Sequence, residues 1–107
     1  MWTLETALSF VRELEARLRP IGYSVALGGS VLLHGKSPSH LDLVIYPLSS
    51  KGLRPQSLKS ALLEHGLTQV ATRERVQQVW RRKGSDDTKH VEIWRTNDRR
   101  VDLFFLQ

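Results

Sequence analysis

The sequence predicts a single domain, residues 1–107, of the α/β (α+β) class: a small mixed β-sheet with helices packed on it. Segments whose apolar residues recur every three or four positions, as in amphipathic helices, are interspersed with shorter segments in which apolar and polar residues alternate. Near the C-terminus, the turn-forming pair Asn97-Asp98 separates two such short segments and predicts a hairpin. A chain of 107 residues, 40% of them hydrophobic, is enough for one domain with one core.

The first half of the chain predicts two helices and two strands. A helix is expected over residues 3–19, with Thr3 as its cap, and Pro20 should end it. Its apolar stripe is expected to comprise Leu4, Leu8, Val11, Leu14 and Leu18. The elements expected next are a strand over 23–27, a break at Gly28-Gly29-Ser30, a short helix over 31–34, a loop over 36–39 and a strand over 40–46.

The second half predicts a helix that begins at Pro55 and ends near Gly66. Residues 67–71 favour a strand and residues 72–83 a helix. Residues 91–94 and 101–104 are expected to form the two strands of the hairpin.

Composition excludes several classes of protein. The chain has no cysteine, which excludes disulfides, a thiolate zinc site and a cysteine nucleophile, and which suits the cytoplasm. No apolar run approaches the ~20 residues of a membrane span, and the acidic start lacks the basic flank of a signal peptide. Nine basic and five acidic residues between Arg73 and Arg100 predict either an anionic partner, such as nucleic acid or a nucleotide, or simply a solvated surface.

Gly28-Gly29-Ser30 lies between an expected strand and an expected short helix. Two glycines allow a sharp turn and let a bulky anion approach the backbone, and a helix start offers unpaired N–H groups. Together with the Ser30 hydroxyl, these groups suit a phosphate. A tight turn with a serine cap would explain the same residues, and the glycine spacing matches neither the Walker nor the Rossmann pattern.

Three side chains have the chemistry to bind a divalent cation. Alternation along the strand over 40–46 places His40 and Asp42 on one side and the leucines between and after them on the other. Asp102 lies in the apolar segment RVDLFFL, where a carboxylate needs a partner, a metal or an exposed strand end. A strand with a polar outer face would explain His40 and Asp42 equally well.

In this order and spacing, the motifs resemble the minimal nucleotidyltransferase fold, the superfamily of polymerase-beta-like enzymes, CCA-adding enzymes and aminoglycoside nucleotidyltransferases. That pattern runs from a strand through Gly-Ser and a short helix to a strand with two acidic residues one apart, and a third acidic residue lies on a later strand. The segments GGSVLLHGKSPSHLDLVIY and RRVDLFF supply Gly29-Ser30, His40-x-Asp42 and Asp102. The resemblance covers nearly the whole chain.

The resemblance implies transfer of a nucleoside monophosphate from an NTP to a hydroxyl group of RNA, a protein or a small molecule. It implies that Gly28, Gly29 and Ser30 hold the triphosphate, and that Asp42, Asp102 and residue 40 hold Mg²⁺ or Mn²⁺. Larger relatives add a helical domain. The resemblance therefore also implies a helical partner protein or a homodimer, as in the small members that form toxin–antitoxin pairs.

His40 departs from the family pattern, which has Asp or Glu at this position. Neutral imidazole has one lone pair and no charge, so it cannot bridge two ions, and it prefers softer metals than Mg²⁺. Three interpretations stay open: an inactive site, a single cation such as Mn²⁺, or a role for His40 as a base or phosphate ligand. The alternative function is a degenerate family member that binds nucleotide, nucleic acid or a partner protein without catalysis. A nucleic-acid-binding module that uses the basic C-terminal half is a third interpretation.

Overall fold

The computed structural model describes residues 1–49, 54–70 and 90–106, and it confirms the α+β class. In these residues, three α-helices pack on a five-stranded mixed sheet, and a two-stranded sheet lies beside them. The elements are β1 (Trp2–Thr3), α1 (Leu4–Leu18), a 3₁₀ turn (Arg19–Ile21), β2 (Tyr23–Gly28), α2 (Gly29–His34), β3 (Lys36–Ser37), β4 (His40–Pro47), α3 (Pro55–Glu64), β5 (Leu67–Gln69), β6 (His90–Thr96) and β7 (Arg99–Phe105).

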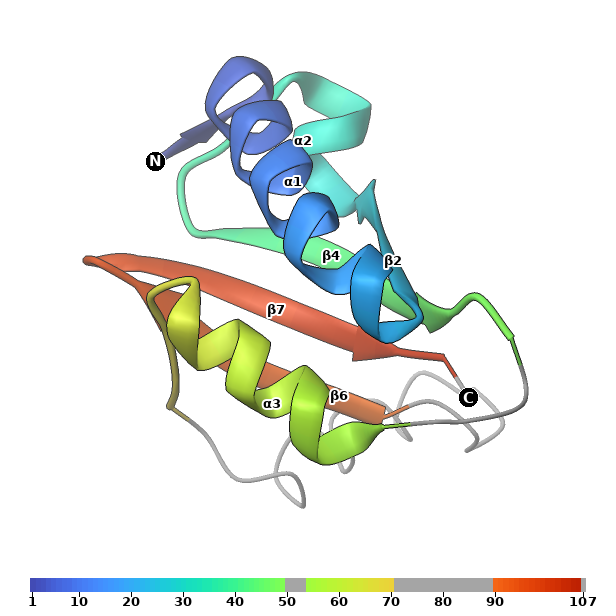
Figure 1. Cartoon of the computed structure of the whole chain (residues 1–107). Coiled ribbons are helices and arrows are strands. Elements are labelled where there is room, and N and C mark those ends of the chain that lie inside the picture. Colours follow the sequence, from blue (N-terminus) through green and yellow to red (C-terminus); the bar gives the residue numbers. More distant parts are fainter. Residues whose placement is uncertain (50–53, 71–89, 107) are drawn as a thin grey trace.

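The five strands of the larger sheet follow the order β2-β4-β7-β6-β5. β4 pairs with β7 in parallel, and every other neighbouring pair in this sheet is antiparallel. The parallel pair brings together strands from distant parts of the chain (Figure 1). Its register sets Asp42 opposite Asp102 and Leu43 opposite Leu103. Because side chains alternate along a strand, β4 and β7 together build one apolar face and one face that carries their polar side chains. Val44 and Phe104 also belong to this second face, which is called the polar face.

Helices α1 and α3 cover the apolar face of the sheet (Figure 1). Leu41, Leu43, Val101 and Leu103 of the two central strands are each 0% exposed. They belong to one buried cluster that also contains Leu14 and Leu18 of α1, Leu58 and Leu62 of α3, and Trp94 of β6. The core therefore lies on one side of the sheet and leaves the polar side free of helix packing from α1 and α3.

Helix α1 confirms the predicted helix and its N-terminal cap, but the predicted apolar stripe is partly wrong. Ala7, Leu14 and Leu18 are buried, whereas Leu4 and Leu8 are 39% and 37% exposed. Ala7 is the residue of the first two turns that faces the core, so the two leucines beside it lie on the flank of the helix. The small side chain of Ala7 suits this position because it lets the helix approach its neighbours closely.

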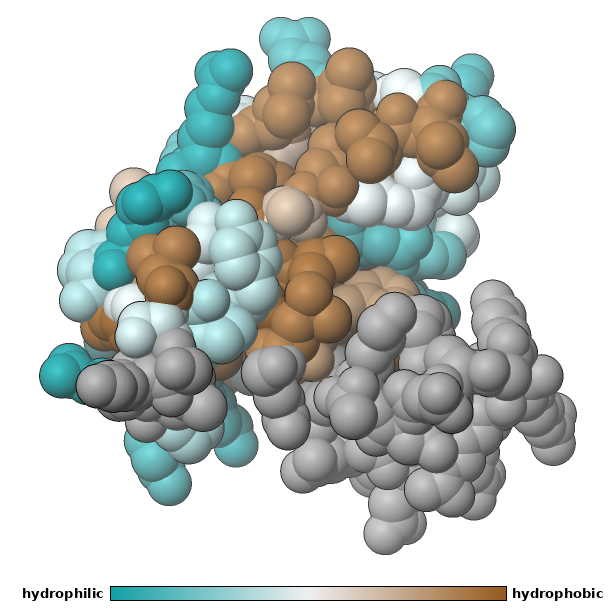
Figure 2. All heavy atoms as spheres, turned by 90° about the vertical axis from the view of Figure 1, so that its right-hand side faces the viewer, coloured by the Kyte–Doolittle hydropathy of each residue, from teal (hydrophilic) through white to brown (hydrophobic). Residues whose placement is uncertain are grey.

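The exposed leucines of α1 lie near those of α2. The backbone N–H of Leu4 donates a hydrogen bond to the carbonyl of Gly35, directly after α2, at 2.8 Å. Leu32 and Leu33 are 57% and 76% exposed, and Val31 is the buried residue of this helix. Figure 2 shows apolar side chains gathered over α1 and α2 at the top of the molecule.

The N-terminus forms a strand pair that the sequence did not predict. Residues 36–37 were expected in a loop but form β3, which pairs with β1. Trp2 of β1 is 1% exposed and packs edge-on against Phe10, with ring centroids 5.4 Å apart. Its indole Nε1 donates to the carbonyl of Arg100 at 3.0 Å, which ties the N-terminus to the start of β7.

The C-terminal half confirms helix α3, strand β5 and the hairpin of β6 and β7. Gly66 follows α3 with φ +86°, and Asn97 in the hairpin turn has φ +54°, the left-handed backbone that such positions require. The helix expected over residues 72–83 lies outside the described residues. Within the described parts of the chain, no helix has the length and apolar character needed to cross a membrane.

One edge of the sheet is covered by a side chain of α1. Strand β2 is an edge strand, and Glu15 accepts hydrogen bonds from the Ser24 hydroxyl at 2.7 Å and from the Val25 N–H at 2.8 Å. Arg19 donates to the same carboxylate at 2.7 Å. Burial raises the pKa of Glu15, but the hydrogen bonds from these three groups and the charge of Arg19 outweigh it, so the pKa is lowered overall. An ionised Glu15 therefore closes part of the β2 edge.

Candidate active site

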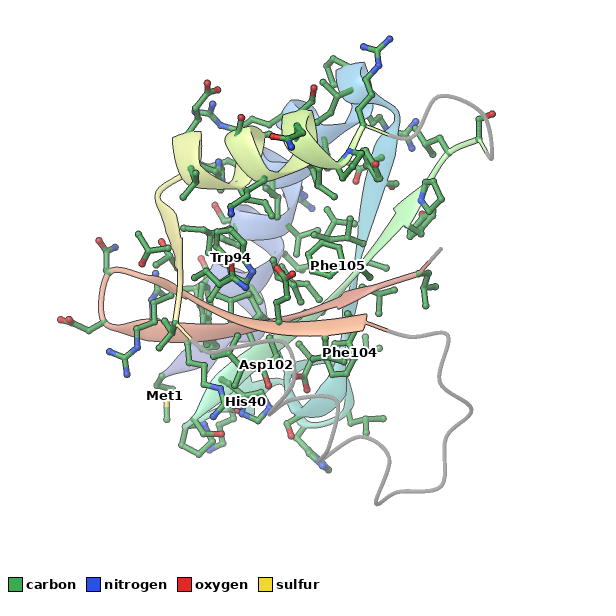
Figure 3. The ribbon with its side chains drawn as sticks, turned by 90° about the horizontal axis from the view of Figure 1, so that it is seen from below. Met1, His40, Trp94, Asp102, Phe104 and Phe105 are labelled. Atoms are coloured by element: carbon green, nitrogen blue, oxygen red, sulfur yellow. The ribbon has the colours of Figure 1, made fainter. Side chains whose placement is uncertain are left out.

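The polar face of β4 and β7 brings together the three predicted metal-ligating residues. The Nε2 atom of His40 lies 3.2 Å from Oδ1 of Asp42 and 3.9 Å from Oδ2 of Asp102. One ligand atom from each residue lies within 4.8 Å of the others. Figure 3 shows His40 and Asp102 on one side of the sheet, and Trp94 and Phe105 on the other. The prediction that His40 and Asp42 share a face is confirmed.

Gly28, at the end of β2, and Gly29, at the start of α2, lie against Asp42 of this cluster. Gly28 is directly opposite Asp42 in the antiparallel pair of β2 and β4. Gly29 has φ +65°, and a Cβ atom built on it would lie 1.9 Å from Oδ2 of Asp42. No side chain larger than hydrogen fits between this backbone and the carboxylate, so the second glycine is needed for both conformation and space. Ser30 follows in α2 and is exposed.

Two serines contact His40, one at its imidazole and one at its backbone. The Oγ atom of Ser39 lies 2.9 Å from Nδ1 of His40, and the backbone N–H of His40 donates to Oγ of Ser37 at 3.3 Å. When Ser39 accepts the hydrogen bond from Nδ1–H, the lone pair on Nε2 faces the two carboxylates. In this tautomer Nε2 of His40 is available to bind a metal ion, and in the other tautomer Nε2–H donates to Asp42.

Arg100 holds the carboxylate of Asp102 with two hydrogen bonds. Its Nε donates to Oδ1 at 2.8 Å, and its terminal NH2 group donates to Oδ2 at 3.1 Å. The hydrogen bond to Asp102 is the main cause that raises the pKa of Arg100; burial opposes this rise, and the charges of Asp102 and Asp42 add to it. The guanidinium is therefore a permanent positive charge beside the two carboxylates.

Sequence reasoning missed Arg100, Ser39 and Ser37 as parts of this site. Arg100 was counted only as one of the basic residues of the C-terminal half, although the period of two along a strand places it on the same face as Asp102. This two-residue alternation was the sequence signal that could have identified Arg100 as part of the site. The serines could not have been found in this way, because their contacts depend on how the chain enters β4.

The cluster fits a divalent cation in its distances and in its donor atoms. Ligand bonds of about 2.1 Å allow two ligands of one ion to lie up to about 4.2 Å apart. Both distances from Nε2 of His40 are within that span, and the ligand atoms of all three residues lie within 4.8 Å of one another. One imidazole and two carboxylates suit Mn²⁺ better than Mg²⁺, which prefers oxygen ligands.

A scan against models of known protein families and a search of curated proteins gave no match for this chain, and its function is therefore inferred from the site.

Proposed function

We propose that this chain is a metal-dependent nucleotidyltransferase that moves a nucleoside monophosphate from an NTP to a hydroxyl group. The observation that carries the proposal is that Asp42 and Asp102 lie opposite each other on parallel strands, while the Gly28-Gly29 backbone lies against Asp42. A metal bound by two carboxylates beside an open glycine backbone is an arrangement suited to a nucleoside triphosphate.

In the transfer, the acceptor oxygen forms a bond to the α-phosphorus, and the bond from that phosphorus to the oxygen bridging to the β-phosphate breaks. Pyrophosphate leaves with the electron pair, and the hydroxyl proton passes to a base or to solvent. A divalent cation, when bound, supplies positive charge for the phosphates and lowers the pKa of the hydroxyl. Asp42, Asp102 and His40 would hold it. Their strands are fixed by pairing on both sides, so the ligands are positioned by the sheet itself.

Gly28, Gly29 and Ser30 are proposed to bind the phosphates. Gly29 and Ser30 are exposed, so a phosphate can approach them from solvent, and the Ser30 hydroxyl can donate a hydrogen bond to it. RNA, a protein or a small molecule would supply the acceptor hydroxyl, and a helical partner protein or a second copy of this chain would help to bind it.

His40 favours a single cation over a pair. Its Nε2 has one lone pair and cannot bridge two ions, so the proposed enzyme is expected to work better with Mn²⁺ than with Mg²⁺. The relative rate with the two metals therefore tests the role given to His40.

The decisive experiment combines NTP binding with label transfer. We expect Mn²⁺ together with an NTP to raise the thermal midpoint of the wild-type protein, because a ligand that binds only the folded state stabilises it. Label from an α-³²P NTP should pass to RNA, to protein or to a small hydroxyl compound. Asp42→Asn should abolish both effects, whereas Asp98→Asn, the same change in the hairpin turn, should leave both unchanged.

A midpoint that no NTP shifts in the presence of either metal, together with no transfer to any acceptor, would contradict the proposal. A shift that persists in Asp42→Asn would place the nucleotide elsewhere.

The second candidate is a nucleotide-binding protein of the same fold without catalysis. His40 and the Arg100–Asp102 pair favour it, because both reduce the negative charge that two catalytic cations would need. His40→Asp separates the candidates. Transfer that appears only in His40→Asp would show that the natural chain is a binder, and transfer that falls in this variant would show that His40 takes part in the reaction. Binding of nucleic acid that weakens steeply with salt and ignores Asp42→Asn would instead favour the nucleic-acid module.

A further inference from the structure

Arg100 is hydrogen-bonded to the carboxylate of Asp102, which a metal ion would also need as a ligand. Both oxygens of Asp102 accept hydrogen bonds from its guanidinium, in the parallel two-bond geometry that arginine forms with carboxylates. A carboxylate has about four lone-pair positions, and this pairing uses one on each oxygen. The positions left for a metal then lie beside a fixed positive charge.

The backbone of Arg100 is held as firmly as its side chain. The indole of Trp2 donates to its carbonyl at 3.0 Å, and its neighbours in the parallel and antiparallel pairs are His40 and Arg95. The side chain of Arg100 is nevertheless 43% exposed, whereas that of Asp102 is 11% exposed. The guanidinium can therefore leave toward solvent while the carboxylate stays in place.

The charges of the site explain why the Arg100–Asp102 ion pair affects metal binding. Asp42 and Asp102 are two negative groups on one face, and Arg100 neutralises part of their charge. We infer that Arg100 is a resident counter-cation of Asp102, which a metal ion must displace in order to bind. This inference rests on the proposed function only in its use of Asp42 and Asp102 as metal ligands. It adds that metal affinity is set by competition with a side chain of the chain itself.

The test measures Mn²⁺ binding in the absence of nucleotide, by calorimetry and by the electron paramagnetic resonance signal of free Mn²⁺. Arg100→Gln removes the charge and the two-bond pairing, and we expect it to bind Mn²⁺ about two- to fivefold more tightly than wild type, the effect of losing a partly exposed competing ion pair. Arg100→Lys keeps the charge but loses the paired geometry, so its affinity should lie between the two.

Arg95→Gln is the matched control. Arg95 lies opposite Arg100 on β6 and carries the same charge, but the carboxylate of Asp102 is held by Arg100. If charge alone governs metal affinity, Arg95→Gln will tighten Mn²⁺ binding as much as Arg100→Gln, and the inference is wrong. Unchanged or weaker binding in Arg100→Gln would also overturn it, because Arg100 would then support Asp102 for the metal instead of competing with it.

Failure of this inference can be distinguished from failure of the proposed function. If wild type, Arg100→Gln and Arg100→Lys all bind no Mn²⁺, the metal site itself is wrong. If Mn²⁺ binds to wild type and to Arg100→Gln with equal affinity, and Asp42→Asn abolishes binding in both, the metal site stands and only the competition is refuted. The thermal midpoint of each variant shows whether it is folded. If Arg100→Gln does not fold, the Mn²⁺ affinity of Arg100→Lys still tests the competition.

Discussion

The two faces of β4 and β7 differ in how their side chains are held. On the face toward α1 and α3, Leu41, Leu43, Val101 and Leu103 are fully buried in one cluster. On the other face, Asp42 and His40 are only partly buried and Arg100 is exposed, and their polar contacts lie within β4, within β7 and between the two strands. The same two strands thus supply part of the apolar core on one side and the proposed chemistry on the other.

The contrast between the apolar and polar faces shows how a small sheet can position a polar site. Apolar burial is worth roughly 25 cal/mol per Å² and does not depend on direction, so the leucines fix where the strands lie. Hydrogen bonds and ion pairs contribute little net stability but do depend on direction, so they fix how the polar side chains point. Substitutions on the two faces should therefore have separable effects.

The largest effect on stability is expected from the apolar face. Leu103→Ala removes a side chain with 0% exposure from the centre of the sheet, and such changes cost about 2–5 kcal/mol in the free energy of unfolding. Urea unfolding of the variant and of the wild type measures this cost. A loss below about 1 kcal/mol would show that the core reorganises around the cavity and that the leucines do not fix the strands.

The next largest effect is expected at Gly29, which lies against Asp42 of the polar face. Gly29→Ala forces a non-glycine residue to φ +65° and drives its Cβ into the carboxylate of Asp42. We expect a cost of about 1–3 kcal/mol together with loss of metal binding. Gly35→Ala is the matched control, because Gly35 has φ +78° but open space around a Cβ. Equal stability and equal Mn²⁺ binding in the two variants would show that the contact with Asp42 has no importance.

The local elements could be predicted from the sequence because short-range patterns determine them. Alternation in HLDLVIY gives the faces of β4, and Asn97-Asp98 gives the hairpin turn. The same alternation gives the common face of His40 and Asp42. Each of these predictions depends on residues a few positions apart.

The parts that could not be predicted depend on contacts between distant residues. Helical spacing allows several overlapping stripes in α1, and only the packing of Ala7 decides that Leu4 and Leu8 lie on the flank. The bond from the Trp2 indole to the Arg100 carbonyl joins residues 98 positions apart, and no local pattern indicates it. The parallel register that sets Asp42 opposite Asp102 follows from the whole sheet, because hydrophobic alternation alone leaves the pairing partner open.

A smaller and pH-dependent effect is expected at the edge of the apolar face. Because the pKa of Glu15 is lowered in the folded protein, the unfolded chain binds a proton more readily at this position. The stabilisation by Glu15 is therefore complete above the unfolded pKa near 4.5 and is lost as the pH falls through the lower folded pKa. Glu15→Gln should cost about 1 kcal/mol at pH 7 through its weakened hydrogen bonds to Ser24 and Val25.

Unfolding free energies measured between pH 7 and pH 3 should show this cost shrinking as the pH falls. Glu13→Gln, a change at an exposed carboxyl of the same helix, should leave the acid limb of the wild-type curve unchanged. A difference between wild type and Glu15→Gln that stays constant down to pH 3 would mean that the charge of Glu15 does not hold the β2 edge.

The smallest effect on stability is expected from Asp102→Asn, next to Leu103 but on the polar face. The asparagine keeps the shape and one acceptor oxygen for Arg100, whose side chain is 43% exposed and can turn to solvent. The cost should be below about 1 kcal/mol, as for other partly exposed ion pairs, while Mn²⁺ binding is lost. Urea unfolding and metal titration of the same sample measure both effects. If Asp102→Asn instead destabilises the protein as much as Leu103→Ala, the Arg100–Asp102 pair is part of what holds the sheet together. The polar face would then be a structural surface, and the separation between the two faces would fail at the residue on which the proposed chemistry most depends.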